Sequence, residues 1–432
     1  MLHQHYRERF SFSDFSCLQE ETAVVNNAPK LNIRELANEA LVLINERGLH
    51  SNDVINDALA KYSRIDLRDK ALFVRLIHGT LEYQIRIDYI INRFSNIKVQ
   101  KMKPFIRNLL RMSVYQLLYM DKIPDNSVCD EAVKLVKKTA YRQLSGFVNG
   151  VLRNIARQKS TITVSDLPTD LSVRPWMFDL LAEMIGVEKT TEFLKYSLKE
   201  HGVSVRKAGT DEVYVLDDSK DITSSDAWIK GEIIVQDYSS SLPVILADIK
   251  QGQTVLDVCA APGGKSIQAS EKVGPCGTVI SCDISEKKLA KIRENTNRLK
   301  ISNIRTVLQD AAVFNESFRN SADVVLADCP CSGIGTISKK PEIKNRLTSD
   351  DCISLADIQY SILSNVCEYV KNGGKLVYST CTLDHFENQD NLHRFLDEHP
   401  EFCLVKEKIM IPSEDSPIPF DGFYIAVMEK ND

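Results

Sequence analysis

The sequence predicts two parts of different structural class, an all-helical N-terminal domain and a C-terminal α/β domain. From residue 31 to about 160, apolar residues recur every three or four positions, the spacing of amphipathic helices. From about residue 231, short apolar strands alternate with helices, which predicts a parallel sheet covered on both faces. At 432 residues the chain is long enough for two or three domains.

Composition places the chain among ordinary globular proteins, with 43% hydrophobic and 26% charged residues. No apolar run reaches the roughly 18–20 residues of a membrane span, and the first residues lack the basic-then-apolar order of a secretory signal. The eleven cysteines show no disulfide spacing, which suits a reducing compartment. We therefore expect a cytoplasmic protein without membrane contact, and we expect residues 1–30 to be a disordered extension.

Helical periodicity is clearest in residues 104–121, where Ile106, Leu110, Val114 and Leu117 fall on one face. Residues 51–62, 67–94 and 145–157 show the same pattern, so we expect a compact helical domain over 31–160. Residues 30–160 hold 23 lysines and arginines against 13 acids, although the whole chain has a net charge of −5. This basic balance suggests either a nucleic-acid partner or merely a charged helical surface, and charge alone leaves both open.

One stretch of the helical region has a more specific character. It reads "LLRMSVYQLLYMDKIPDNSVCDEAVKLVKK" (109–138) and is followed by "SGFVNGVLRNI" (145–155). This order of residues resembles the antitermination factor NusB family of RNA-binding helical domains.

Residues 161–230 predict a small α+β connector. The segment 171–186 is typical of a helix entered through Arg-Pro-Trp, and 202–217 of short strands. The α/β domain follows over 231–432. Its expected strands are 232–236, 254–260, 277–284, 304–310, 322–329, 374–381 and 422–430.

"VLDVCAAPGGKS" (255–266) puts a glycine pair between a strand and a helix, where backbone N–H groups can approach a ligand closely. A phosphate-binding P-loop would need glycine where Cys259 stands, and the dinucleotide pattern G-x-G-x-x-G is absent. A nucleoside site without phosphates remains, as for S-adenosylmethionine. Its expected loop residues are Cys259, Ala260, Ala261, Pro262, Gly263, Gly264 and Lys265.

Acids stand at the ends of the next strands, where ligands bind in parallel sheets. Asp283 is placed to accept hydrogen bonds from ribose hydroxyls, and Asp310 to reach the exocyclic amine of adenine. Asp328 ends the fourth strand. Asp257 lies inside the first strand, and we expect it to be a buried partner of the loop.

Two strands, one of them the strand that ends at Asp328, are followed by cysteines. "LVYSTCTLD" (376–384) stops its apolar run at Ser379, and "ADCPCSG" (327–333) follows an apolar strand. Either cysteine alone would be read as a small residue closing a strand. Together with "VQDYSSSLPVILADIKQGQTVLDVCAAPGGKS" (235–266) and "DGFYIAVM" (421–428), they resemble the RNA cytosine-5 methyltransferases. With the helical N-terminus, the chain resembles the bacterial members that act on 16S ribosomal RNA, over residues 31–430.

The resemblance implies a Rossmann-like, S-adenosylmethionine-dependent methyltransferase domain and a role for each thiol. Cys381 would add to carbon 6 of cytosine so that carbon 5 can attack the methyl group. Asp328 would hold ring nitrogen 3, and Cys331 would promote release of the adduct. Lys265 would orient Asp328 or favour the thiolate, unless it is simply an exposed lysine at a helix start. Cys329 is expected to pack, because no second ligand pair for a metal accompanies it. We expect a monomer.

Other functions remain to be weighed. A non-catalytic RNA-binding assembly factor would be expected to lose Cys381 or Asp328, and both are present. A DNA cytosine methyltransferase would use Cys331 as its nucleophile but would lack the second cysteine. Transfer RNA is an alternative substrate for the same chemistry. The family's usual Arg-x-Asn stretch is matched here only by 204–206, which puts RNA contacts of the connector in doubt. A basic surface after the release loop would comprise Lys339, Lys340, Lys344 and Arg346, or these side chains are merely solvated.

Overall fold

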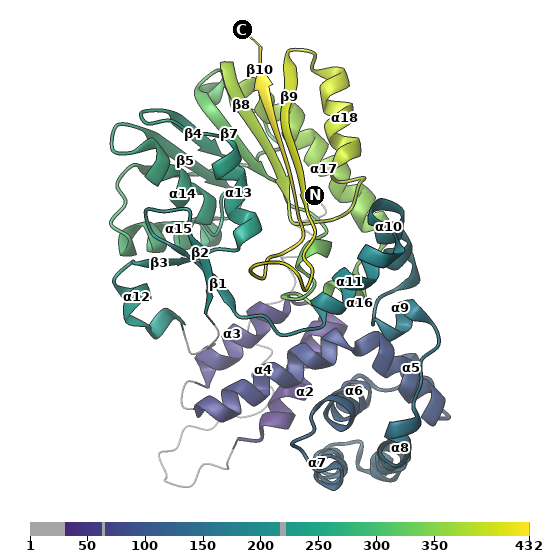
Figure 1. Cartoon of the computed structure of the whole chain (residues 1–432). Coiled ribbons are helices and arrows are strands. Elements are labelled where there is room, and N and C mark those ends of the chain that lie inside the picture. Colours follow the sequence, from purple (N-terminus) through teal and green to yellow (C-terminus); the bar gives the residue numbers. More distant parts are fainter. Residues whose placement is uncertain (1–30, 63–64, 217–221, 432) are drawn as a thin grey trace.

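The structure is a computed structural model that describes residues 31–62, 65–216 and 222–431 (Figure 1). The expectation for residues 1–30 lies outside these described residues. No helix within them is long and apolar enough to cross a membrane.

The N-terminal domain is all-helical, as predicted. Its helices pack around a single apolar core to which α6 contributes Leu109, Leu110, Val114 and Leu117. Asn32 caps the first helix by accepting hydrogen bonds from two backbone N–H groups, and Pro104 stands in the first turn of α6, where its missing N–H costs nothing. The helices are α2 (Ile33–Arg47), α3 (Ser51–Lys61), α4 (Leu67–Glu82), α5 (Gln84–Phe94), α6 (Pro104–Tyr119), α7 (Asp125–Lys137) and α8 (Ser145–Gln158).

The connector combines helices with a small sheet, as expected. Its elements are α9 (Leu167–Asp170), α10 (Pro175–Ile185), α11 (Val187–Ser197), β1 (Val203–Lys207), β2 (Val213–Leu216), α12 (Asp226–Ile229) and β3 (Ile233–Val235). The sheet has the order β2-β1-β3. The prediction that 232–236 joins the main sheet is therefore wrong, because β3 pairs antiparallel with β1. A three-residue apolar run indicates a strand but carries no information about its partner.

The C-terminal domain is built on a seven-stranded sheet of order β6-β5-β4-β7-β8-β10-β9. Its strands are β4 (Thr254–Asp257), β5 (Thr278–Asp283), β6 (Ile304–Leu308), β7 (Ala322–Asp328), β8 (Val370–Thr380), β9 (Phe402–Met410) and β10 (Phe423–Lys430). The strands β4 to β8 run parallel, and β10 is antiparallel to both of its neighbours. The edge strand β9 was not predicted, since its centre is exposed and charged, which is how edge strands avoid unwanted pairing.

Helices cover both faces of this sheet (Figure 1). The helices α13 (Tyr238–Leu246) and α14 (Gly264–Val273) share a core with one face. The helices α17 (Ser349–Val366) and α18 (Gln389–Glu398) share a core with the other. The helix α15 (Glu286–Arg298) connects β5 to β6. The expected layered α/β architecture is confirmed, and it leaves the carboxyl ends of the parallel strands to form a site.

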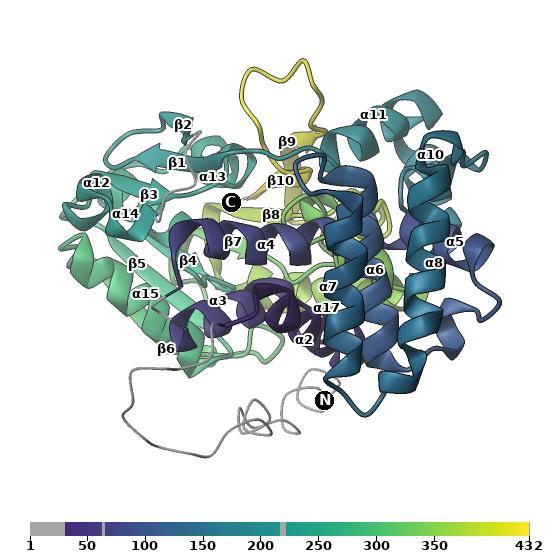
Figure 2. The same ribbon diagram turned by 90° about the horizontal axis from the view of Figure 1, so that it is seen from below.

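A short helix, α16 (Ile343–Arg346), joins the C-terminal domain to the helical domain, which lies across it in Figure 2. Lys344 is buried and donates a hydrogen bond to the carbonyl of Glu82 at 2.8 Å. Arg346 donates to the carbonyl of Gly48, also at 2.8 Å. These two cations therefore anchor the domains to each other.

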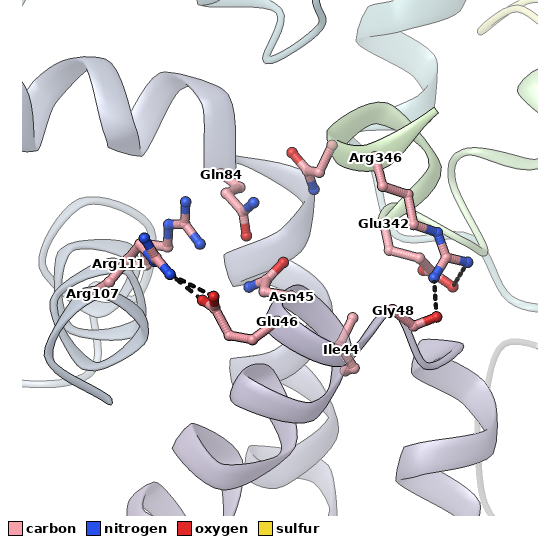
Figure 3. A pocket seen from close by; sticks show the side chains of 10 residues that line it. Ile44, Asn45, Glu46, Gly48, Gln84, Arg107, Arg111, Glu342 and Arg346 are labelled. Carbon is pink, nitrogen blue, oxygen red and sulfur yellow. Dashed lines mark hydrogen bonds and ion pairs between the residues drawn. The ribbon is translucent and has the colours of Figure 1, made fainter. Parts of the chain in front are cut away.

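The same junction encloses a polar cavity of about 290 Å³ (Figure 3). Arg107 and Glu46 form an ion pair on its wall, and Arg346 lies on the opposite side. None of the residues that line it belongs to the predicted site. The predicted site residues lie instead at the strand ends of the sheet.

Candidate active site

The site residues gather because their strands are parallel neighbours. Asp283 ends β5 and Asp328 ends β7, as predicted, and Cys381 directly follows the last residue of β8. Asp310 lies two residues beyond the end of β6 rather than on its last position. Parallel strands place their carboxyl ends on one edge of a sheet, so these side chains share that edge.

The glycine-rich loop between β4 and α14 is held by a glycine contact and by a buried carboxyl group. Gly263 has φ +107°, and a Cβ there would lie 3.3 Å from Ile292, so only glycine fits without strain. Asp257 is fully buried and accepts a hydrogen bond from the hydroxyl of Ser266 at 2.6 Å. Burial raises the pKa of Asp257 to about 7. Asp257 thus braces the loop from inside, as the sequence predicted.

The two strand-end acids also organise their own turns. Asp283 is 5% exposed, and its Oδ1 accepts the backbone N–H of Ser285 at 3.0 Å. Asp310 accepts the N–H of Ala312 at 3.0 Å in the same way. In each case one carboxylate oxygen accepts the backbone N–H of the turn, and the other oxygen of Asp283 lies 3.6 Å from the ammonium group of Lys288.

The two predicted catalytic thiols are in contact. The sulfurs of Cys331 and Cys381 lie 3.2 Å apart. A hydrogen bond from Cys331 lowers the pKa of the Cys381 thiol; burial opposes this effect and the charge of Lys340 adds to it. The same hydrogen bond, together with burial, holds the pKa of Cys331 well above its usual range. Of the two thiols, Cys381 is therefore the one that loses its proton more readily.

Asp328 is held in one orientation beside the thiols. Its Oδ1 accepts a hydrogen bond from Ser379 at 2.8 Å, and its Oδ2 accepts one from Lys265, also at 2.8 Å. Lys265 is only 8% exposed and also donates to Ser240. The alternative of an exposed lysine at a helix start is wrong, and Lys265 orients Asp328. Cys329 is buried in the core of the sheet, as expected of a packing residue.

Two protein-family models match this chain. The model of the family described as 16S rRNA methyltransferase RsmB/F matches residues 244–428, and that of the NusB family matches residues 31–157. Probable ribosomal RNA small subunit methyltransferase B of Bacillus subtilis is 35% identical over 91% of this chain and 94% of its own length. The chain belongs to the ribosomal RNA small subunit methyltransferase B family.

Further relatives agree with this membership. Ribosomal RNA small subunit methyltransferase B of Vibrio cholerae is 28% identical, with 93% of this chain and 98% of its own length covered. Among solved structures, PH0851 has a TM-score of 0.75 at 22% identity, with 94% of this chain and all of that chain covered. A methyltransferase homologue from Pyrococcus horikoshii has a TM-score of 0.53 at 25% identity, with 62% of this chain and all of that chain covered. The expected methyltransferase fold and the NusB-like N-terminal domain are confirmed.

The family uses S-adenosylmethionine, as expected, and the residues at the strand ends fit this cofactor. Beside the acids stand apolar side chains that sequence reasoning missed: Ile284, Leu308 and Val313 are 60%, 58% and 57% exposed. Apolar groups that stay in water next to carboxylates suit a ligand with a flat base and a hydroxylated sugar. The signal in the sequence was an apolar residue directly after the acid that ends β5.

The family's Arg-x-Asn stretch has no functional equivalent at 204–206 in this chain. Arg206 lies on β1 with its side chain fully buried. It donates to Gln236 at 2.7 Å and pairs with Glu271 at 2.6 Å. Arg206 therefore ties the connector sheet to the methyltransferase domain, and its side chain is not free to contact RNA.

Proposed function

We propose that this chain, acting as a monomer, transfers the methyl group of S-adenosylmethionine to carbon 5 of a cytosine in 16S ribosomal RNA through a covalent adduct with Cys381. The contact between two thiols of opposite pKa shift, next to an oriented carboxylate, carries the proposal. The helical domain supplies RNA affinity through its excess of cations, 23 against 13 acids over residues 30–160. Membership of the family favours ribosomal over transfer RNA.

Each group has a task in this chemistry. Carbon 5 of cytosine is a weak nucleophile, and addition of the Cys381 thiolate to carbon 6 makes it enamine-like. Asp328 holds nitrogen 3 while charge develops on the ring. Carbon 5 then takes the methyl group from the sulfonium, which leaves as a neutral thioether. Loss of the proton on carbon 5 breaks the bond between sulfur and carbon 6 and restores aromaticity.

Cys331 suits the release step because of its partner. The hydrogen bond to Cys381 is the main reason that its pKa is high. Once Cys381 is bonded to carbon 6, it no longer accepts that hydrogen bond. Cys331 can then lose its proton to solvent and remove the proton on carbon 5.

The test separates the two thiols. We expect Cys381→Ala to lose activity and to form no protein–RNA adduct with a 16S ribosomal RNA fragment. Cys331→Ala should still attack and should accumulate as a slow band on a denaturing gel. Cys329→Ala, a buried neighbour without a role, should behave as the parent.

A DNA-type mechanism predicts the reverse pattern. Cys331→Ala would then trap nothing, and Cys381→Ala would stay active. Activity in Cys381→Ala would refute the proposal. Bisulfite mapping of ribosomal and transfer RNA from a deletion strain identifies the substrate, because the unmethylated cytosine appears in only one of them.

A further inference from the structure

Glu387 is a buried carboxyl group beside the thiols that the mechanism above does not use. It lies between β8 and α18, in the segment that follows Cys381, and its side chain is fully buried. Its Oε2 accepts the backbone N–H of Ser332 at 2.9 Å and the side-chain amide of Gln359 at 2.7 Å. Ser332 directly follows Cys331. Glu387, which lies after Cys381, therefore contacts the loop that carries Cys331.

Gln359 completes this contact from the other side of Cys331. Its Nε2 also donates to the carbonyl of Pro330 at 2.9 Å. Its Oε1 accepts hydrogen bonds from Tyr378 at 2.9 Å and Asn391 at 3.3 Å, which fixes the orientation of the amide. The backbone groups before and after Cys331 are thus both held by the Glu387–Gln359 pair.

A second link joins the two loops directly. The hydroxyls of Ser332 and Thr382, each the residue after a catalytic cysteine, lie 2.7 Å apart. Further along the Cys331 loop, the backbone N–H of Gly335 also donates to the carbonyl of Cys381 at 3.0 Å. Glu387 adds the contact to the backbone N–H directly after Cys331.

We propose that Glu387 is a positioning residue that, with Gln359, holds Cys331 against Cys381 for release of the covalent adduct. The inference rests on the proposed function, because it presumes that Cys331 acts in release. A buried polar group that accepts two hydrogen bonds at one oxygen keeps a loop in a single arrangement. The attack by Cys381 does not need this arrangement, so the two steps should respond differently to its loss.

Two other acidic or thiol groups lie around Glu387. Cys352 and Asp384 place ligand-type atoms within 4.8 Å of it. Oε1 of Glu387 and Oδ2 of Asp384 have no hydrogen-bond partner, and burial raises the pKa of both carboxyls, that of Glu387 to about 7. Because these three groups are also possible metal ligands, the test below includes a search for a bound metal ion.

The test measures how much of the full-length protein accumulates as the covalent adduct and how fast the adduct is released. In Glu387→Ala we expect normal S-adenosylmethionine binding by calorimetry, adduct formation with a 16S ribosomal RNA fragment, and release slowed by at least about tenfold, so that the adduct accumulates. Glu387→Gln keeps an acceptor oxygen and should recover release to within about threefold. Asp390→Asn, which removes an exposed carboxyl three residues further on, in the first turn of α18, is the matched control.

Three results would overturn the inference. The first is a Glu387→Ala variant that releases the adduct as fast as the parent. The second is a Glu387→Ala variant that neither forms the adduct nor binds the cofactor, which would indicate a general structural role. The third is a metal ion that copurifies with the parent and is lost in the variant. If Glu387→Ala does not fold, Glu387→Asp, with its acceptor drawn back by one methylene, should show the same accumulation in milder form. If Cys381→Ala stays active, or Cys331→Ala traps no adduct, the proposed function fails, whatever Glu387 does.

Discussion

Two neighbouring acidic side chains meet in the site, and each has its own partner. Cys381 receives a hydrogen bond from Cys331, whereas the carboxylate of Asp328 is held by Lys265 and Ser379. Two negative groups can lie close together only if such partners compensate them, because burial disfavours charge. The site thus places a thiol of lowered pKa beside a carboxyl group held in one orientation.

At this scale we predict that Lys265→Met lowers methylation by about tenfold to a hundredfold, because Asp328 loses the cation that orients it. Adduct formation in single-turnover reactions should fall with the rate, since Asp328 assists the attack. Lys272→Met is the control, since Lys272 lies on the same helix but pairs with Asp211 on the connector. A parental rate in Lys265→Met would show that Asp328 is positioned by Ser379 alone.

Around Cys381, backbone segments pack so closely that only glycine fits at the contact. The short helical turn Ile334–Thr336 follows the release loop, and Gly335 donates its N–H to the carbonyl of Cys381 at 3.0 Å. The N–H of Gly422, just before β10, donates to the carbonyl of Gly335 at 2.9 Å. Three segments far apart in sequence are thereby joined at the end of β8.

We predict that Gly335→Ala is destabilising by about 2 kcal/mol or more and abolishes methylation. A Cβ at Gly335 would lie 2.0 Å from the carbonyl oxygen of Gly422 and 2.8 Å from that of Cys381, so backbone must move. Gly146→Ala on α8 has no atom within 4 Å of its new Cβ and should be neutral or stabilising by up to about 1 kcal/mol. Thermal unfolding measures both, and equal melting temperatures would contradict the close approach.

Across the whole molecule, the helical and methyltransferase domains are joined by polar contacts that centre on Glu342. Its carboxylate is nearly buried and accepts both the N–H and the hydroxyl of Ser51, at 3.1 and 2.7 Å. Burial raises the pKa of Glu342, but the imidazole of His50, 3.9 Å away, and hydrogen bonds from Ser51 outweigh it and lower the pKa to about 2. The charged form is therefore stabilised in the folded protein.

We predict that Glu342→Gln lowers the free energy of unfolding by about 2 kcal/mol at pH 7. A carboxyl whose pKa is depressed by folding contributes stability above its unfolded value, near 4.3, and loses it as pH falls toward 2. The difference between parent and variant should be constant from about pH 7 to 5 and shrink at pH 3.5. Urea unfolding followed by circular dichroism measures this, and a difference that grows toward acid would contradict the assignment.

The sequence by itself determined the class of each domain and the strand ends at which the acids and thiols of the site gather. These features are local: periodicity is written within one helix or strand, and Asp283, Asp328 and Cys381 stand where apolar runs stop. The sequence also predicted that Lys265 orients Asp328 or favours the thiolate, but it did not predict that Lys265 is buried.

Only the tertiary structure decided which partners distant segments take. It paired β3 with β1, added the charged edge strand β9, and turned Lys344 from a candidate RNA contact into a buried anchor between domains. It also placed Glu387 beside the loop of Cys331. None of these contacts leaves a local pattern, because a strand's partner and a side chain's burial depend on residues tens to hundreds of positions away, which no short window of sequence contains.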